Sequence, residues 1–312
     1  MLPIDQKVKE IESLQRKDYL PKEYVYFYRD LVRCQWESKG RVLIDIPAEE
    51  MDRRLKEGVH LLDFDRLEIE EEPLKHLFLK ICEAIQRYGK RDGAELDRLK
   101  KAAEELDLGR FVRKAALGDA DYFESLSDTL QVEKEYLLFL GIHLGKPFFE
   151  LWAERVRGQI EDRVWRRGTC PVCGHEPAMA RLEREHGRRI LQCSLCSTEW
   201  TFRRMQCPFC SNDDPNRLRF FFVEEASPYR VDVCEECKRY IKTIDERKVE
   251  EGREVTLAVE NVATIHLDIL ASKQGYRSPE FCLFDLSEES VIDEWPSTKL
   301  GESQNAFLEG ST

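Results

Sequence analysis

The first half of the chain, up to about Gly168, follows a helical pattern of apolar positions. Apolar residues recur three or four positions apart, as at Ile4, Val8, Ile11 and Leu14, which places them on one face of a helix. Similar stripes predict helices over 22–36, 71–89, 94–109, 119–130, 132–144 and 146–168. We therefore expect a helical bundle whose apolar and aromatic side chains form its core.

Proline, aspartate and glycine residues mark the expected ends of these helices. Pro21 suits the first position of a helix, and Asp119 suits an N-cap. Gly89 and Gly109 stand where helical stripes stop.

From Thr169 the pattern changes to short alternating runs that are typical of β-strands. Strands are expected over 178–184, 188–193, 198–205, 217–224, 229–233 and 239–245. Turns are expected around Glu185-His186-Gly187 and Ala226-Ser227-Pro228, and a helix over 255–275 closes at Gly275. Beyond Leu286 the chain is acidic and poor in apolar residues, so we expect a flexible tail.

Composition and charge narrow the class of protein. The 312 residues are 42% apolar and 35% charged, and the longest apolar run, 136–145, is too short to span a membrane. The N-terminus has no apolar signal region, so we expect a cytoplasmic protein without direct membrane insertion. The net charge is −12, and only the segment 151–247 is not acidic. This balance disfavours nucleic acid as a partner.

Eight of the eleven cysteines form four Cys-x-x-Cys pairs, whereas Cys34, Cys82 and Cys282 stand alone in apolar surroundings. In a reducing compartment, such pairs indicate metal binding rather than disulfides. Two pairs supply the four thiolates of one tetrahedral site, so the chain has cysteines for two metal ions. The single cysteines are expected to be small buried residues.

The pairs can combine sequentially or in the interleaved order of cross-braced modules, and the gaps between them favour the sequential order. Each long gap, 174–192 and 211–233, contains two strand-like runs around a turn, as a ribbon requires, whereas 197–206 has one strand and resembles a link. The predicted first site is Cys170, Cys173, Cys193 and Cys196. The predicted second site is Cys207, Cys210, Cys234 and Cys237.

Closed four-cysteine sites are structural by default, because small ribbons lack a sufficient core without their metal. Zinc and iron both suit tetrahedral thiolates, and iron would add the capacity to carry an electron. No catalytic or organic-cofactor motif accompanies the cysteines, so we expect no enzyme. His175 and His186 are interpreted as exposed turn residues near the Cys-x-x-Cys turns, which we call the first to fourth knuckles in chain order. Arginines interleaved with acids indicate a mixed solvated surface or a docking face for an acidic partner; they occupy positions 163, 166, 167, 181, 184, 188, 189, 203 and 204.

The cysteine segments resemble the formate dehydrogenase accessory protein family, FdhE. The resemblance rests on CPVCG at 170–174, LQCSLCSTEW at 191–200, CPFC at 207–210 and CEECKRYIK at 234–242. Gly275-Tyr276-Arg277 after a helix also fits. It is specific over 170–285 and loose over the helical half.

The resemblance implies an α+β fold, with an N-terminal all-helical domain, two tandem rubredoxin-like or zinc-ribbon domains and a C-terminal helix. We place the helical domain at 1–168, the first metal domain at 169–203, the second with its helix at 204–286, and the acidic tail at 287–312. The eight paired cysteines would hold two metal ions, zinc or iron. Thr198, Glu199 and Trp200 are motif positions that could contact a partner, and Trp200 could equally belong to the core.

The family resemblance also implies a cytoplasmic maturation factor that contacts the catalytic subunit of formate dehydrogenase. Our first hypothesis is therefore a chaperone-like protein that binds the immature subunit through its metal-stabilised ribbons. The alternative is an iron-loaded, rubredoxin-like donor of electrons or metal to the dehydrogenase. A zinc-ribbon protein that binds nucleic acid is a weaker third hypothesis because of the acidic charge.

Overall fold

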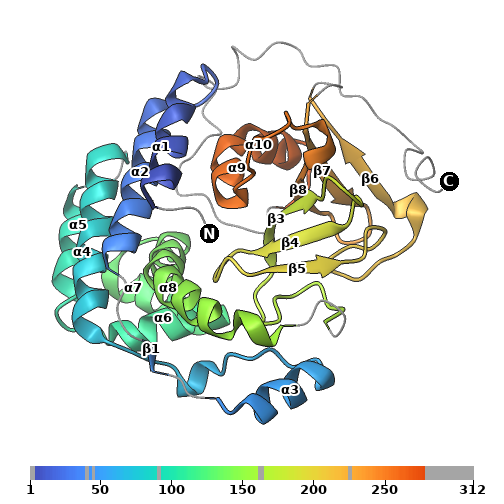
Figure 1. The fold of residues 1–312 in the computed structure, drawn as a ribbon. Coiled ribbons are helices and arrows are strands. Elements are labelled where there is room, and N and C mark those ends of the chain that lie inside the picture. The colour runs from blue at the N-terminus through green and yellow to red at the C-terminus, as the bar shows by residue number, and fades with distance from the viewer. Residues whose placement is uncertain are drawn as a thin grey trace.

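The computed structural model describes residues 4–38, 42–43, 46–89, 93–160, 165–223 and 227–277. Arg163, Glu224, Ala226, Cys282 and the acidic tail lie outside these ranges, so the expectations for them stay predictions. The N-terminal part is helical, and the remainder is built around one sheet (Figure 1). Of the described helices, none combines the length and apolar character needed to cross a membrane.

The N-terminal helices confirm the expected helical region. They are α1 (Ile4–Ser13), α2 (Lys22–Glu37), α3 (Ala48–Glu57), α4 (Glu71–Tyr88), α5 (Gly93–Ala102), α6 (Leu108–Leu117), α7 (Ala120–Leu130) and α8 (Lys134–Val156). The short strands β1 (Val42–Leu43) and β2 (Glu68–Ile69) pair with each other. Asp119 caps α7 as predicted, because its side chain accepts a hydrogen bond from the backbone N–H of Tyr122 at 3.0 Å.

Two helix boundaries differ from those expected. The helix expected over 94–109 ends at Ala102, and Asp107 begins α6 by accepting from the Arg110 N–H at 2.7 Å. The helices expected over 132–144 and 146–168 are joined in the single helix α8, which continues through Pro147 but ends at Val156, before the expected end at 168. Proline cannot donate to the carbonyl four residues earlier, and the His143 carbonyl instead accepts from Gln35 Nε2 at 2.8 Å. A contact from another helix therefore keeps α8 continuous.

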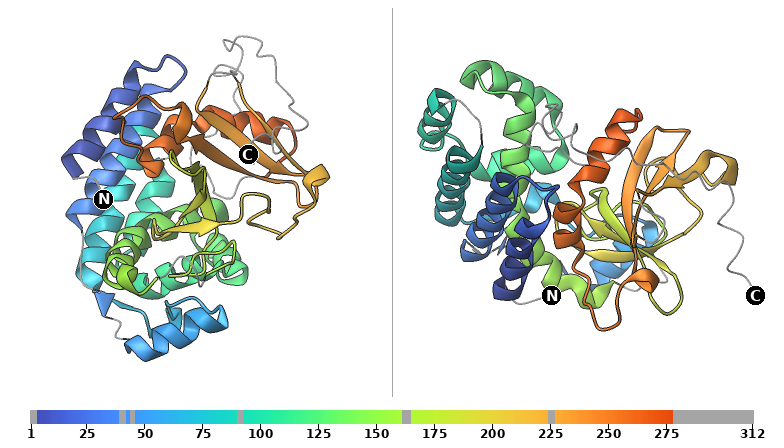
Figure 2. Two further views of the ribbon diagram at one scale, coloured as in Figure 1. Left: turned by 45° about the vertical axis from the view of Figure 1, so that its right-hand side comes forward. Right: turned by 90° about the horizontal axis from the view of Figure 1, so that it is seen from above.

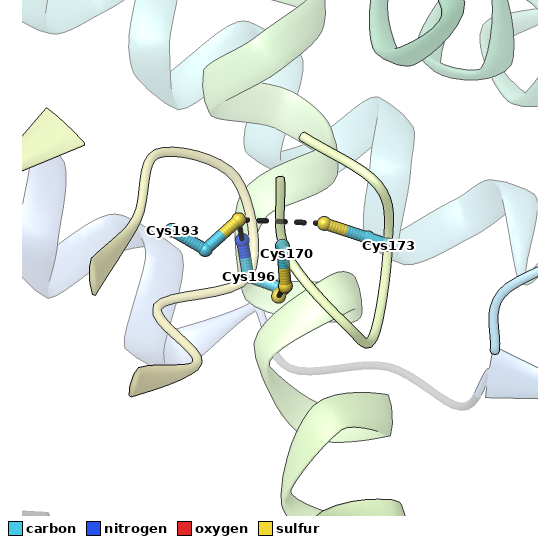
Figure 3. A group of neighbouring side chains, drawn as sticks. All are labelled: Cys170, Cys173, Cys193 and Cys196. Carbon is cyan, nitrogen blue, oxygen red and sulfur yellow. Dashed lines mark hydrogen bonds between the residues drawn. The ribbon is translucent and has the colours of Figure 1, made fainter. Parts of the chain in front are cut away.

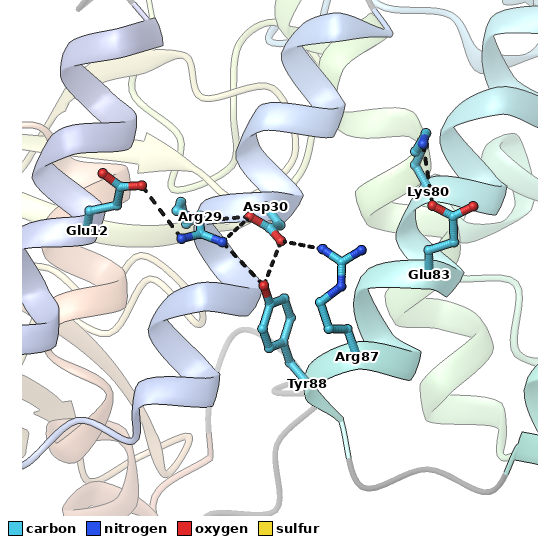
Figure 4. A network of polar contacts seen from close by, with 7 residues as sticks. All are labelled: Glu12, Arg29, Asp30, Lys80, Glu83, Arg87 and Tyr88. Atoms are coloured by element: carbon cyan, nitrogen blue, oxygen red, sulfur yellow. Dashed lines mark hydrogen bonds and ion pairs between the residues drawn. The ribbon is translucent and has the colours of Figure 1, made fainter.

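A polar network joins the outer faces of α1, α2 and α4 (Figure 4). Asp30 is central to it and accepts from Tyr88 Oη at 2.9 Å and from Arg87 at 3.3 Å. Arg29 pairs with Asp30 at 2.7 Å and reaches Glu12 at 3.6 Å. These contacts align helices whose buried faces form the core.

The cysteine-rich part forms one six-stranded sheet with strand order β5-β4-β3-β8-β7-β6. Its strands are β3 (Pro177–Leu182), β4 (Arg189–Cys193), β5 (Glu199–Phe202), β6 (Leu218–Phe221), β7 (Tyr229–Cys234) and β8 (Arg239–Asp245). Each ribbon contributes three antiparallel strands, and the two ribbons join where β3 pairs with β8 in parallel. The segment 197–206, interpreted as a link, therefore contributes β5 as the third strand of the first ribbon.

The expected C-terminal helix is divided into α9 (Leu257–Ala263) and α10 (Ile265–Lys273). These helices cover one face of the sheet and lie beside α1 and α2 (Figures 1 and 2). Tyr24 on α2 donates to the carbonyl of Val262 at 3.4 Å. The two ends of the described chain thus pack together. The domain boundary expected at residue 203 stays a prediction, and the sheet extends across it.

Candidate metal centres

Site 1 consists of Cys170, Cys173, Cys193 and Cys196, whose sulfur atoms all lie within 4.8 Å of one another. Cys170 Sγ is 3.5 Å from Cys196 Sγ, and Cys173 Sγ is 3.3 Å from Cys193 Sγ (Figure 3). Sulfurs about 2.3 Å from a tetrahedral zinc lie roughly 3.8 Å apart. A small expansion of this group would therefore admit one ion.

Site 2 consists of Cys207, Cys210, Cys234 and Cys237, which also lie within 4.8 Å of one another. Its two closest sulfur pairs, 207 with 237 and 210 with 234, are each 3.7 Å apart. The geometry matches a tetrahedral set of thiolates at the same metal–sulfur length. The structure thus pairs the cysteines sequentially, as the gaps predicted, and each group can hold one metal ion. That these cysteines are ligands in the protein stays a prediction.

The same backbone turn is built at every Cys-x-x-Cys pair. The residue after the second cysteine has a positive φ at Gly174 (78°), Ser197 (55°), Ser211 (62°) and Lys238 (55°). At Gly174 the N–H donates to the Cys170 carbonyl at 2.9 Å, and Ser211 and Lys238 make the equivalent bonds at 3.0 and 2.9 Å. This left-handed residue reverses the chain so that both sulfurs of a pair face one point.

Backbone and hydroxyl groups point at the sulfurs of site 1. The N–H groups of Val172 and Leu195 lie 3.4 and 3.3 Å from Cys170 Sγ and Cys193 Sγ. Thr198 Oγ1 lies 3.1 Å from Cys196 Sγ. A metal ion binds cysteines as thiolates, and hydrogen-bond donors in these positions stabilise the negative charge of the thiolates.

The thiols differ in their tendency to ionise. Burial raises the pKa of Cys170 and Cys173 well above the ordinary value. Burial also opposes ionisation of Cys196, but hydrogen bonds from the other three thiols and from Thr198 outweigh it and lower its pKa. At site 2, burial raises the pKa of Cys237 to about 11. Binding a dication would remove the protons that remain on such thiols.

The two sites differ in their exposure to solvent. All four cysteines of site 1 are buried and belong to the main hydrophobic core, together with Trp152 of α8. At site 2, Cys210 is exposed and Cys237 is partly exposed. Site 1 is therefore part of the core, whereas site 2 lies at the surface.

The helical part makes hydrogen bonds directly to the first and second knuckles. The N–H groups of Leu61 and Leu62 donate to the carbonyls of Pro171 and Val172 at 3.0 and 2.7 Å. From α8, Lys146 Nζ donates to the Ser194 carbonyl at 2.6 Å. Sequence analysis missed these contacts because they join segments more than 45 residues apart, and no local pattern signals them.

The three motif residues after the second knuckle occupy different environments. Trp200 is 2% exposed and donates through Nε1 to the Arg167 carbonyl at 3.1 Å, so it is a core residue. Thr198 is buried beside Cys196. Glu199 is exposed and pairs with Arg181 at 3.0 Å. A partner contact by these residues stays a prediction, and Glu199 is the member of the three that solvent reaches.

A cavity of about 670 Å³ reaches site 1 from the boundary between the helical part and the sheet. Cys196 and Glu199 line it from the ribbon, Glu150 and Arg157 from α8 and the turn after it, and Arg253 from the loop before α9. Sequence analysis did not predict this cavity. Neither His175 nor His186 joins a sulfur group. His186 is exposed as expected, whereas His175 is partly buried, with its Nε2 2.6 Å from the Ala116 carbonyl oxygen.

Fold and sites together define a protein with a helical N-terminal part and two four-cysteine ribbons that share one sheet. The family model described as "FdhE, central domain" matches residues 169–204. The "Protein FdhE homolog" of Aquifex aeolicus (strain VF5) is 27% identical, over 75% of this chain and 77% of that protein. The homologue of Haemophilus ducreyi is 29% identical over 53% of this chain, which spans about half the length of that relative (54%).

A solved structure agrees with these matches. The crystal structure of the FdhE protein from Pseudomonas aeruginosa has a TM-score of 0.63 and 18% sequence identity, and the match covers 90% of this chain and 94% of that one. At this identity the likeness is one of fold. The chain is thus similar to FdhE proteins in its cysteine-rich segment, in its overall sequence and in its fold.

Proposed function

We propose that the protein is an accessory factor for formate dehydrogenase that binds the immature catalytic subunit in the cytoplasm. Similarity to FdhE proteins supports this role, since the sequence resemblance implies a maturation factor. The proposed ligands are the eight paired cysteines, which leave no coordination position open for a substrate at either ion. A binding role therefore fits these sites better than catalysis.

The exposure of site 2 bears on which surface of the protein contacts the subunit. A metal site that served only to hold a ribbon together would gain from burial, as at site 1. Cys210 instead lies at the surface, and the adjacent Phe209 is half-buried with the Arg239 guanidinium 4.0 Å from its ring centroid. Aromatic and arginine side chains are enriched at protein interfaces. We infer that the knuckles of site 2 form part of the surface that contacts the subunit.

The test is a pull-down of tagged protein from its native host, combined with metal analysis of the same sample. Wild-type protein should capture the dehydrogenase subunit and carry two metal equivalents, whereas Cys210→Ser should lose one equivalent and most of the captured subunit. Cys34→Ser is the matched control, because Cys34 lies outside both sulfur groups. Normal dehydrogenase activity in a strain that lacks the protein would contradict the proposal.

The exposure of site 2 also favours a second candidate function, donation of electrons or metal to the dehydrogenase. An exposed iron–thiolate site places the redox centre near a partner's surface. Protein made anaerobically in iron-replete medium should then contain iron at site 2 with a reversible potential. Zinc in both sites under these conditions would contradict this function and leave the binding role intact.

A further inference from the structure

The structure divides the arginines that the sequence grouped into one basic face. Arg181 pairs with Glu246 at 2.8 Å, and Arg188 pairs with Glu183 at 2.7 Å. Arg189 and Arg204 of the first ribbon lie close to Arg230 and Arg247 of the second ribbon, near the end of the β3–β4 hairpin. We call this group the arginine cluster; it comprises Arg189, Arg204, Arg230 and Arg247.

Strand register explains why Arg189 and Arg230 share one face of the sheet. Arg189 on β4 is paired with Leu182 on β3, and Leu182 is paired with Asp245 on β8. Two residues earlier on β8, Thr243 is paired with Arg230 on β7. Paired residues, and residues two apart, point to the same side of a sheet. Asp232, two residues beyond Arg230, therefore shares this side.

Two carboxylates neutralise only part of the cluster. Asp232 lies 2.9 Å from Arg230 and 3.6 Å from Arg189, and it also accepts from the Thr243 hydroxyl at 2.7 Å. Asp245 accepts two hydrogen bonds from Arg247, at 2.8 and 2.7 Å. The four guanidinium groups thus share two carboxylates, which leaves an excess of two positive charges.

Arg204 is the member without a carboxylate. Within the described part of the chain, no acidic oxygen lies within 4.0 Å of its guanidinium nitrogens, and its Nε is buried without a hydrogen-bond acceptor. Arg204 and Arg247 each place a nitrogen within 3.5 Å of the position that a Cβ on Gly187 would take, so the two groups are close neighbours. Burial lowers the pKa of Arg204, and the charges of Arg230 and Arg247 lower it further.

Partly buried like charges are unfavourable unless an anion offsets them. We propose that the arginine cluster binds a phosphate group, free or carried as a monoester, between Arg204, Arg230 and Arg247. A phosphate monoester carries about −1.5 to −2 charge at neutral pH and three acceptor oxygens, which suits three guanidinium groups and an excess of two charges. A carboxylate brings only one negative charge and two acceptor oxygens, so it matches the cluster less well than a phosphate monoester does. This site is independent of the proposed dehydrogenase role.

The test uses the full-length, zinc-loaded protein and inorganic phosphate, titrated calorimetrically against chloride at constant ionic strength. Wild-type protein should bind one equivalent of phosphate. Arg204→Gln should weaken binding by about tenfold or more, because it removes a charge-assisted contact. Arg203→Gln is the matched control: it removes the same charge from the adjacent, exposed residue and should leave the affinity unchanged.

A second measurement distinguishes a binding residue from a structural one. Without phosphate, Arg204→Gln should unfold at the same temperature as wild type or higher, since it relieves repulsion; a lower temperature would contradict the proposal.

Absence of phosphate binding to wild type, or equal weakening by Arg203→Gln, would also overturn it. A phosphoserine peptide that binds more tightly than free phosphate would identify a protein-borne group, and equal affinity would identify a small ligand. Equally tight binding of duplex DNA, or of the same peptide with glutamate in place of phosphoserine, would overturn the assignment to phosphate monoesters.

Discussion

At the scale of single residues, Gly168 shows how closely the two ribbons approach each other. It precedes the first knuckle, and a Cβ at this position would lie 1.9 Å from the carbonyl oxygen of Pro208, inside the third knuckle. A backbone oxygen at that distance cannot move aside as a flexible side chain can. Glycine is therefore required here by the contact between the chain entering site 1 and a knuckle of site 2.

We predict that Gly168→Ala lowers the free energy of unfolding by about 1–3 kcal/mol, the usual cost of overpacking. Gly158→Ala is the control, because a Cβ there would meet no atom within 4 Å. Chemical denaturation of both metal-loaded variants measures the difference. Equal stability of the two variants would show that the ribbons do not make this contact.

At the scale of secondary-structure elements, a buried ion pair ties α10 to the sheet. Lys242 on β8 is 3% exposed, and its Nζ donates to Asp268 at 2.6 Å and to the Asn261 carbonyl at 2.8 Å. Asp268 also accepts from the Tyr240 hydroxyl at 2.7 Å. The carboxylate thus satisfies two groups of β8 beneath the helix.

Asp268→Ala should lower the free energy of unfolding by about 3 kcal/mol, since it leaves a buried ammonium without its counter-ion. The control is Glu236→Ala, which breaks the exposed pair with Arg217 (58% and 54% exposed) and should cost less than about 1 kcal/mol. Urea denaturation followed by circular dichroism measures both. Similar small losses would mean that Lys242 finds another acceptor.

At the scale of the whole molecule, the metal sites divide between core and surface. Site 1 belongs to the core that extends into the helical part, so opening it requires separation of packed elements. Site 2 has an exposed cysteine, and its sulfurs contact one another and the Asn212 side chain of the second ribbon. Loss of metal should therefore proceed differently at the two sites.

A strong chelator added to zinc-loaded protein should release one equivalent quickly and the second slowly. The helical circular-dichroism signal should persist through the first release and fall with the second, because site 1 is packed against α8. Cys210→Ser, which disables site 2, should show the slow release alone. Release of both equivalents in one phase would contradict the division of the sites.

The residue patterns alone predicted the helical N-terminal part, most strands, the eight clustered cysteines and their sequential pairing. These features are local: helical stripes, alternating runs and Cys-x-x-Cys spacing act within a few residues or across one hairpin. The left-handed residues that complete the knuckles were less visible, because only Gly174 of the four is a glycine.

Only the tertiary structure decided how these pieces meet. The parallel pairing of β3 with β8, the burial of site 1 against α8 and the joining of Arg204 with Arg247 depend on contacts between distant segments. Pro147 illustrates the reason: its own sequence context predicts a break, and Gln35, more than one hundred residues away, supplies the hydrogen bond that keeps α8 continuous. Local pattern therefore determined the elements and the grouping of the cysteines. Long-range packing determined which site is buried, which is exposed, and where excess charge collects.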